Sequence, residues 1–317
     1  MKSIHIITAL LILPATSALG RVVCEQCDDH IVVTRDGYHV LTYHKTVQIP
    51  AGVEAKYGRS GFIHPISTPS GRVITDDYPL PHHGHQHGVY FAWRSTTFED
   101  KQMNFWEHGK ETVRHDKVLE IMNKKRFAGF RVQLAHVSGT RKILREIWTV
   151  MVYSDTGYID LTSEQRCATE SPITLERFHY GGMAVRGSRQ WFKDAHTSAG
   201  KGALKDEFVE SCKMITNEGL TLANGNHSQP NWVCMTGAID AAPVSITFVP
   251  HPTNFRHPQY VRLHPDMPYF CFIPTVEKPF DIEPGKPLVS RYRIIAEDGE
   301  PDTAKLNAVQ QAFALEK

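Results

Sequence analysis

The feature that most constrains the fold is a recurring series of short runs in which apolar and polar residues largely alternate. Residues 30–34 and 38–43 are rich in β-branched and aromatic side chains and flank Asp36-Gly37, a dipeptide typical of tight β-hairpin turns. Similar runs return at 130–134, 145–153, 158–162, 244–249 and 289–295. Evenly spaced strands separated by turn residues predict an all-β protein, built as a large antiparallel β-sandwich.

The C-terminal segment has a different pattern. Asp302 suits the N-cap of a helix, and the apolar residues after it, up to Phe313, recur at roughly helical spacing. We therefore expect one C-terminal helix. The sequence contains no internal repeat, low-complexity tract or linker, so we expect residues 21–317 to form a single β-sandwich domain. The more polar residues 186–210 suggest a long loop over the sandwich.

Residues 1–20 resemble a signal peptide. Lys2 precedes the apolar run 6–13, and Ala18-Leu19-Gly20 fits a small-x-small cleavage site. The run is too short to span a bilayer, and no other segment reaches about 18 apolar residues. We expect a periplasmic or secreted protein without a membrane span. A buried N-terminal strand or helix is the alternative reading of the same residues.

Charge and cysteine usage narrow the class of protein further. The formal net charge is +1, so there is no basic excess that would indicate a nucleic-acid partner. After export the six cysteines would be in an oxidising compartment. There they could form disulfides or, equally, remain buried free thiols. Cys24 and Cys27 form a CxxC without a second such motif, which argues against a zinc site there.

Among 18 histidines, the cluster of His82, His83, His85 and His87 is the strongest candidate for chemistry. It runs directly into the apolar segment 89–93, which would anchor it in the fold. In an extended chain His85 and His87 project from the same face. Such paired imidazoles suit acid–base catalysis or binding of a transition metal. The alternative is that these histidines lie in a solvated loop and have no role in chemistry.

A complete metal site would need a further ligand from elsewhere in the chain, such as Glu107 or His257. The sequence therefore leaves open whether His83 and His85 hold a divalent metal. Gly-rich phosphate loops, GxSxG elbows and HExxH helices are not found in the sequence, which disfavours nucleotide-binding, serine-hydrolase and zincin functions.

The segment Phe105-Trp106-Glu107 suits a sugar site. Aromatic rings stack on the C–H faces of sugars, and a carboxylate can accept a hydroxyl proton or act as a base. The alternative is that Phe105 and Trp106 belong to the hydrophobic core and Glu107 is exposed.

Several further candidates lie in proline- or glycine-rich segments that should form polar loops. Arg256 could clamp a carboxylate or a sugar oxygen. A proline-stiffened surface loop needs no ligand, and a lone loop histidine often only caps local backbone groups. These candidates are His64, His179, Asn254, Arg256 and His257.

At these motifs the chain resembles a bacterial family catalogued as methane oxygenase PmoA-like, which is common in polysaccharide-degrading bacteria. The resemblance covers nearly the whole mature chain. The segments that carry it are, in order, His64-Pro65, Thr68-Pro69-Ser70-Gly71, 73–79, His83-Gly84-His85-Gln86-His87-Gly88, Phe91-Ala92-Trp93, Thr97-Phe98-Glu99, Phe105-Trp106-Glu107, His251-Pro252, Asn254, Arg256-His257-Pro258 and Tyr292-Arg293.

The resemblance implies a fold similar to the galactose-mutarotase super-sandwich and a place in carbohydrate metabolism. In that family the position of His87 is often Arg and that of Gly84 often Pro, which favours His83 and His85 over His87 as catalytic residues. A true particulate methane monooxygenase subunit spans the membrane several times. This chain has no span beyond the signal-like segment, so the sequence argues against methane oxidation.

We therefore expect an exported carbohydrate-active enzyme, a glycoside hydrolase or lyase with a carbohydrate substrate. The alternatives are a non-catalytic carbohydrate-binding protein and a metal-dependent oxidoreductase. The expected catalytic residues are His83, His85, Glu107 and His257. The expected substrate-binding residues are His64, His87, Trp106, His179, Asn254 and Arg256.

Overall fold

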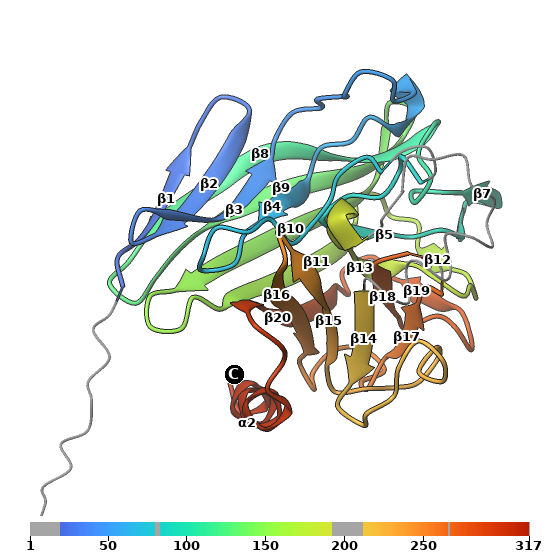
Figure 1. Cartoon of the computed structure of the whole chain (residues 1–317). Helices are drawn as coiled ribbons and strands as arrows, with labels where there is room; N and C mark the ends of the chain where they lie inside the picture. The colour runs from blue at the N-terminus through green and yellow to red at the C-terminus, as the bar shows by residue number, and fades with distance from the viewer. Residues whose placement is uncertain (1–19, 80–82, 192–211, 266, 317) are drawn as a thin grey trace, which may run out of the picture.

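The computed structural model describes residues 20–79, 83–191, 212–265 and 267–316, which form three antiparallel sheets and a C-terminal helix (Figure 1). The predicted all-β, antiparallel architecture with a C-terminal helix is confirmed. Most of the signal-like segment 1–20, and residues 192–210 of the expected polar loop, lie outside the described residues. Among the described residues, no helix is both long and apolar enough to cross a membrane.

Two eight-stranded sheets make up most of the structure. The first has the order β1 (Val22–Gln26), β2 (His30–Arg35), β3 (Tyr38–His44), β4 (Phe62–Ile66), β5 (Val89–Ala92), β13 (Gly182–Arg186), β18 (Tyr269–Ile273) and β17 (Tyr260–Leu263). The second has the order β14 (Cys212–Thr216), β15 (Val233–Ile239), β16 (Ala242–Pro250), β20 (Leu288–Asp298), β11 (Ile159–Cys167), β10 (Arg141–Tyr153), β9 (Phe127–Ser138) and β8 (Glu111–Asn123).

The remaining elements are short. A four-stranded sheet has the order β19 (Phe280–Ile282), β12 (Ile173–Leu175), β6 (Thr96–Phe98) and β7 (Lys101–Met103). Within the described ranges, the helices are the 3-10 turns η1 (Ala55–Tyr57) and η2 (Arg189–Trp191) and the α-helix α2 (Thr303–Ala314).

The predicted hairpin and helix have the local chemistry that the sequence indicated. The turn between β2 and β3 places Asp36 at φ 54° and Gly37 at φ 84°, and Asp and Gly are among the residues that tolerate this left-handed region. Helix α2 begins after Asp302, whose carboxylate accepts a hydrogen bond from the Lys305 backbone N–H at 3.0 Å.

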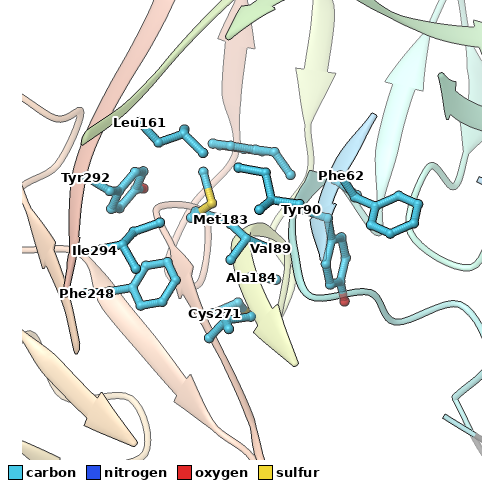
Figure 2. Close-up of a cluster of buried hydrophobic side chains, with 14 of the residues drawn as sticks. Phe62, Val89, Tyr90, Leu161, Met183, Ala184, Phe248, Cys271, Tyr292 and Ile294 are labelled. Carbon is cyan, nitrogen blue, oxygen red and sulfur yellow. The ribbon is translucent and has the colours of Figure 1, made fainter. Parts of the chain in front are cut away.

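The main hydrophobic core lies between the two large sheets. Figure 2 shows Leu161, Phe248 and Ile294 of the second sheet pointing toward Val89 and Met183 of the first. All five side chains are at most 1% exposed, so the alternation within the second sheet places its apolar residues on the inner face. This core fixes β5, β13, β17 and β18, and with them the segments that enter and leave these antiparallel strands at both ends of the first sheet.

The six cysteines all lie in the described residues, and none is paired with another. Burial raises the pKa of Cys271 to about 11 and holds this thiol protonated within the core.

Candidate functional site

A pocket of about 170 Å³ opens beside the first sheet, between the segments before β5, after β7 and before β13 and the connection from β17 to β18. The described residues that line it are His83, His85, Gln86, Trp106, Glu107, His179, Tyr180, Arg262, His264 and Tyr269. Half of these were predicted from the sequence, namely His83, His85, Trp106, Glu107 and His179. The structure brings them together; a role in chemistry remains a prediction.

The histidines come from a tight turn before β5 and from the end of β17. The ring centroid of His83 lies 5.6 Å from that of His85 and 6.0 Å from that of His264. The backbone N–H of Gln86 donates to the His83 carbonyl at 2.8 Å, which closes the turn. The Gln86 side chain accepts a hydrogen bond from Arg186 of β13 at 2.9 Å, so the turn is anchored to the sheet.

Burial determines the protonation of two of these imidazoles. It lowers the pKa of His85 to about 3, and the nearby charge of Arg186 acts in the same direction. Burial likewise lowers the pKa of His264 to about 3, assisted by Arg262. Both rings are therefore neutral near pH 7, where each can accept a proton or a hydrogen bond.

Trp106 forms the floor of the pocket. Its ring centroid lies 5.1 Å from that of Tyr90, 5.2 Å from that of Tyr180 and 5.9 Å from that of Tyr269. The residue is only 2% exposed, so it offers less open ring face to a sugar than the sequence suggested. Tyr180 and the exposed His179 are more accessible, and their rings lie 4.7 Å apart.

Glu107 is held by two donors. Arg94 Nε donates to Oε1 and Asn104 Nδ2 donates to Oε2, each at 3.1 Å. The Asn104 side-chain oxygen in turn accepts hydrogen bonds from the backbone N–H groups of Trp106 and Glu107. The carboxylate is thus fixed at the pocket wall, where its remaining lone pairs can accept hydrogen bonds from a ligand.

Arg262 supplies a cation whose charge is not matched by a direct partner. Within the described part of the chain, its guanidinium makes no hydrogen bond or ion pair. It lies on the partly exposed face of β17 and lines the same pocket as His179 and His264, and its charge acts on both imidazoles. An arginine so placed can bind a carboxylate or another anion in bidentate fashion.

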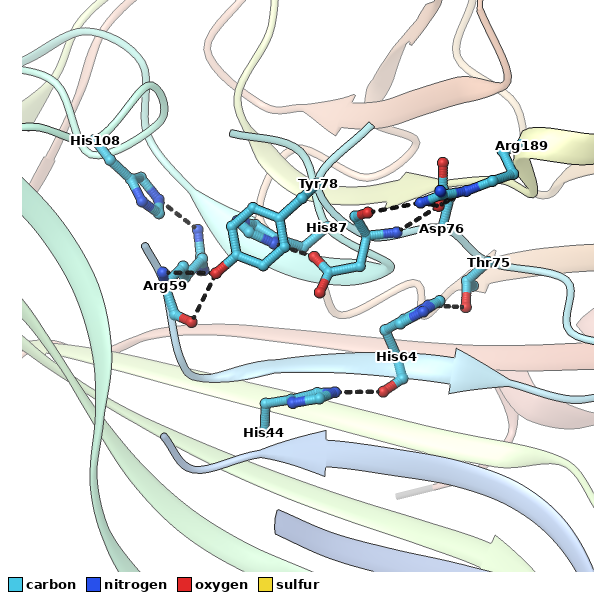
Figure 3. A network of polar contacts seen from close by, with 10 residues as sticks. His44, Arg59, His64, Thr75, Asp76, Tyr78, His87, His108 and Arg189 are labelled. Carbon is cyan, nitrogen blue, oxygen red and sulfur yellow. Dashed lines mark hydrogen bonds and ion pairs between the residues drawn. The ribbon is translucent and has the colours of Figure 1, made fainter. Parts of the chain in front are cut away.

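His64 and His87 lie in a separate buried network (Figure 3). His87 is completely buried, and its Nδ1 is 2.5 Å from Asp77 Oδ1. His64 Nδ1 contacts the Thr75 hydroxyl at 2.9 Å, and the His64 carbonyl accepts a hydrogen bond from His44 Nε2 at 2.7 Å. Neither lines the pocket, so the structure gives no support to the substrate contact that the sequence predicted for these two residues.

Asn254 has a structural role. It is 4% exposed, and its side chain brackets Arg291 by donating to the Arg291 carbonyl at 2.9 Å and accepting from the Arg291 N–H at 2.7 Å. This side chain connects the proline-rich loop to β20. It is therefore not available to a substrate, contrary to the prediction.

Arg256 and His257 line a different pocket, of about 290 Å³, with Gln229, Tyr260, Pro274, Glu277 and Lys278. Arg256 is used internally, since its guanidinium donates to three backbone carbonyls, those of Pro274, Lys278 and Pro279. The sequence predicted that these residues would face His83 and His85 across one site; the structure separates them.

Within the residues that the structure describes, no three His, Cys, Asp or Glu side chains are grouped so as to hold a metal ion. Of the further ligands that the sequence suggested, Glu107 is engaged by Arg94 and His257 lines the other pocket. His82 of the cluster lies outside the described residues.

The buried histidines predict a loss of stability in mild acid. Burial lowers the pKa of His64 to about 4 and that of His85 to about 3, from an ordinary value of 6.5. Since the folded state resists protonation, the unfolded chain takes up these protons first as the pH falls below 6.5. The stabilisation is complete above pH 6.5, and each histidine removes about 1.4 kcal/mol per pH unit below it until the pH reaches its folded pKa.

Thermal melts at constant ionic strength check this expectation. The melting temperature should fall steadily between pH 6.5 and 4, because that window lies between the unfolded and folded pKa values. His64→Asn should make the fall shallower, because one titrating group is removed. A melting temperature that stays constant from pH 7.5 to 5 would contradict the assignment of neutral, buried imidazoles.

Comparison with known proteins corrects one prediction from the sequence. The family model that matches, over residues 30–311, is described as "Family of unknown function (DUF6807)". The predicted resemblance to the methane oxygenase PmoA-like family is therefore wrong. None of the curated proteins matches the chain.

Solved structures similar to this chain include enzymes of carbohydrate metabolism, all at low identity. An α-N-acetylgalactosaminidase from Bifidobacterium bifidum, in complex with GalNAc, is 12% identical, with 93% of this chain and 38% of that chain covered and a TM-score of 0.40. A heparan sulfate lyase from Pedobacter heparinus is 10% identical, with 90% and 36% covered and a TM-score of 0.35. This chain thus spans well under half the length of either enzyme.

A third structure is close to this chain in length. It is a galactose mutarotase-like protein from Clostridium acetobutylicum, 8% identical, with 89% of this chain and 99% of that chain covered and a TM-score of 0.43.

Proposed function

This chain belongs to the DUF6807 family, and we propose that it is an exported carbohydrate-active enzyme that cleaves an acidic glycan by β-elimination in the histidine pocket. The observation that carries the proposal is the convergence of neutral imidazoles, an arginine without a carboxylate partner and a tyrosine hydroxyl around a single carboxylate. Each of these groups matches one requirement of the reaction.

The first requirement is recognition of the substrate anion. In a uronate, the hydrogen on C5 is acidic only in so far as the neighbouring carboxylate can take up the charge left on C5. Arg262 lines the pocket without a partner among the described residues, so it is available to bind that carboxylate. A preorganised cation aimed at developing charge is worth about 10²–10³-fold in rate.

The second requirement is a base and an acid. A neutral imidazole, from His85 or His264, accepts the C5 proton. The electrons of the broken C–H bond form a C4–C5 double bond, and the C4–O bond breaks. Burial raises the pKa of Tyr180, so its hydroxyl keeps a proton that it can donate to the leaving oxygen. Glu107 and Gln86 supply acceptors for sugar hydroxyls.

Hydrolysis fits the pocket less well. Most glycoside hydrolases use a pair of carboxyl groups on opposite sides of the scissile bond. Glu107 is the only carboxylate among the described residues that line this pocket, and it is tied to Arg94 at 3.1 Å. Of the two chemistries that the sequence predicted, elimination therefore has the better support.

The test is a screen of neutral and uronate-containing oligosaccharides with detection of products by mass. Elimination yields fragments whose masses sum to that of the substrate, and one fragment gains an ultraviolet absorbance from its new double bond. Arg262→Gln should lower cleavage by about 10²-fold. The exposed Arg145→Gln on β10 is the matched control and should have no effect.

Other outcomes of the screen identify the competing functions. A gain of one water per cleavage would show hydrolysis and overturn elimination. Binding without any product would show a non-catalytic carbohydrate-binding protein.

A further inference from the structure

The edge strand β17 connects the histidine pocket to the pocket at His257. Its alternation leaves Tyr260 and Arg262 partly exposed, whereas Val261 and Leu263 are buried. Figure 1 labels β17 beside β18. Residues two apart on a strand project from the same face about 7 Å from each other. Tyr260 lines the second pocket and Arg262 the first, so the two pockets are neighbours on one face of the sheet edge.

Two loops that contact each other each line one of the pockets. The backbone N–H of Phe178 donates to the Thr275 carbonyl at 3.4 Å, and Arg177 Nε donates to the Val276 carbonyl at 3.1 Å. His179, the next residue along, lines the histidine pocket, whereas Glu277 lines the second one. The pockets are thus held in a fixed relation by backbone contacts.

The second pocket is rigid and polar. The three hydrogen bonds of Arg256 to backbone carbonyls fasten the loop that carries Glu277 and Lys278. The Tyr260 hydroxyl donates to Glu277 Oε1 at 2.5 Å, which holds the phenol ring at the pocket wall. His257 Nδ1 is shielded from solvent and has no hydrogen-bond partner among the described residues.

These groups form a surface that suits a second sugar. A phenol ring offers a face for C–H stacking, Glu277 and Gln229 offer hydrogen-bonding groups to hydroxyls, and Lys278 offers a positive charge to an acidic unit. A distance of about 7 Å along the strand is on the scale of one sugar ring. A glycan that enters the histidine pocket can therefore continue along β17 into the second one.

We propose that the pocket lined by His257, Tyr260, Glu277 and Lys278 is a second glycan subsite, which binds a further unit of the chain that is cleaved in the histidine pocket. The inference rests on the proposed function, and it specifies the substrate as an oligosaccharide or polysaccharide rather than a monosaccharide or disaccharide. Linked subsites add affinity because the second contact is intramolecular.

The experiment measures cleavage of uronate oligosaccharides of two, four and six units. For the unmodified protein, KM should fall with length once the chain reaches the second pocket. Tyr260→Ala should raise KM for the longer substrates by about tenfold and leave kcat and all disaccharide kinetics unchanged. Lys278→Ala, at an exposed position that cannot disturb the core, should act in the same direction if Tyr260→Ala fails to fold.

Two results would overturn the subsite: unchanged kinetics for every length in both variants, or an equal loss on the disaccharide and the hexasaccharide. If the unmodified protein cleaves nothing, calorimetric titration with the same series separates the two proposals. If affinity increases with glycan length in the unmodified protein but not in the Lys278→Ala variant, the subsite is supported although the proposed elimination is overturned. Affinity independent of length would overturn the subsite as well.

Discussion

Replacing His85 with alanine is expected to lower the rate of glycan cleavage by about 10²–10⁴-fold and to leave the melting temperature nearly unchanged. The imidazole lines the pocket and is partly exposed, and its recorded contacts are ring contacts to Tyr57 and His83 at 6.0 and 5.6 Å. Its loss therefore removes a proton acceptor without leaving a large cavity in the core. The measurements are kcat on a substrate identified in the screen and a thermal melt of each variant.

His87, two residues along the same segment, is the matched control. It is fully buried, pairs with Asp77 at 2.5 Å and packs on Phe62 with ring centroids 4.5 Å apart. We expect His87→Ala to cost about 2–5 kcal/mol of stability, because it leaves a cavity in the core and removes the hydrogen-bond partner of the Asp77 carboxyl group, whose pKa is raised by burial to about 7. If His85→Ala lowers the melting temperature and leaves kcat intact, His85 is a structural residue and the acid–base proposal fails.

The contrast between His85 and His87 shows why sequence alone could not rank the cluster. Alternation places both on one face of an ideal strand, but residues 83–87 form a turn and an irregular segment, so the two side chains separate. The partner of His87 is Asp77, which no spacing rule connects to it. The ranking of His85 over His87 rested on a family resemblance that proved wrong, so it was not a physical inference and stays a prediction.

The fold was predictable where one face of a strand meets solvent. Strands β2, β3 and β10 alternate in burial, and their sequence runs show it. Strands β13 and β18 are buried on both faces, so they lack a period of two and were missed. Arg262 was missed for a related reason: its place in the pocket depends on the neighbouring strands and loops and not on any local motif.

Replacing Glu146 with alanine is expected to lower the free energy of unfolding by about 3–5 kcal/mol, the largest loss of stability that we predict for a single substitution. Glu146 is completely buried on β10, and Oε2 lies 2.7 Å from His136 Nε2. The other oxygen, Oε1, accepts hydrogen bonds from Trp148 Nε1 at 2.7 Å and from the Ser163 hydroxyl at 2.5 Å. Alanine would leave all these buried donors without a hydrogen-bond acceptor.

The cluster around Glu146 also supports the loop that carries Trp106 and Glu107. Gln165 donates to Glu146 at 3.2 Å and accepts a hydrogen bond from Trp93 Nε1 at 2.8 Å. The Trp93 carbonyl in turn accepts a hydrogen bond from the Phe105 backbone N–H at 3.0 Å. Phe105, just before Trp106, packs on His136 with ring centroids 5.4 Å apart. Partial unfolding of this cluster should therefore loosen the candidate site, so Glu146→Ala should also lower activity below the melting transition.

Glu146→Gln separates the charge from the hydrogen bonds. The amide oxygen can keep the donors Trp148, Ser163 and Gln165, and its NH₂ can face His136 if the imidazole adopts the tautomer with the proton on Nδ1. We expect Glu146→Gln to lose less than half as much stability as Glu146→Ala. Glu120→Ala, an exposed carboxylate on β8, should stay within about 0.5 kcal/mol of the unmodified protein.

Acid should act on the same cluster. Burial opposes ionisation of the Glu146 carboxyl, but hydrogen bonds from His136, Ser163 and Trp148 outweigh it and lower the pKa. A lowered folded pKa means that the stabilisation is complete above the ordinary glutamate value and is lost as the pH falls through the folded one. In chemical denaturation at pH 7, the free energy of unfolding of Glu146→Ala should therefore lie below that of the unmodified protein by the full difference of about 3–5 kcal/mol predicted above. In strong acid this difference in free energy should become smaller. Equal midpoints for Glu146→Ala and Glu120→Ala at pH 7 would show that the core does not depend on this carboxylate.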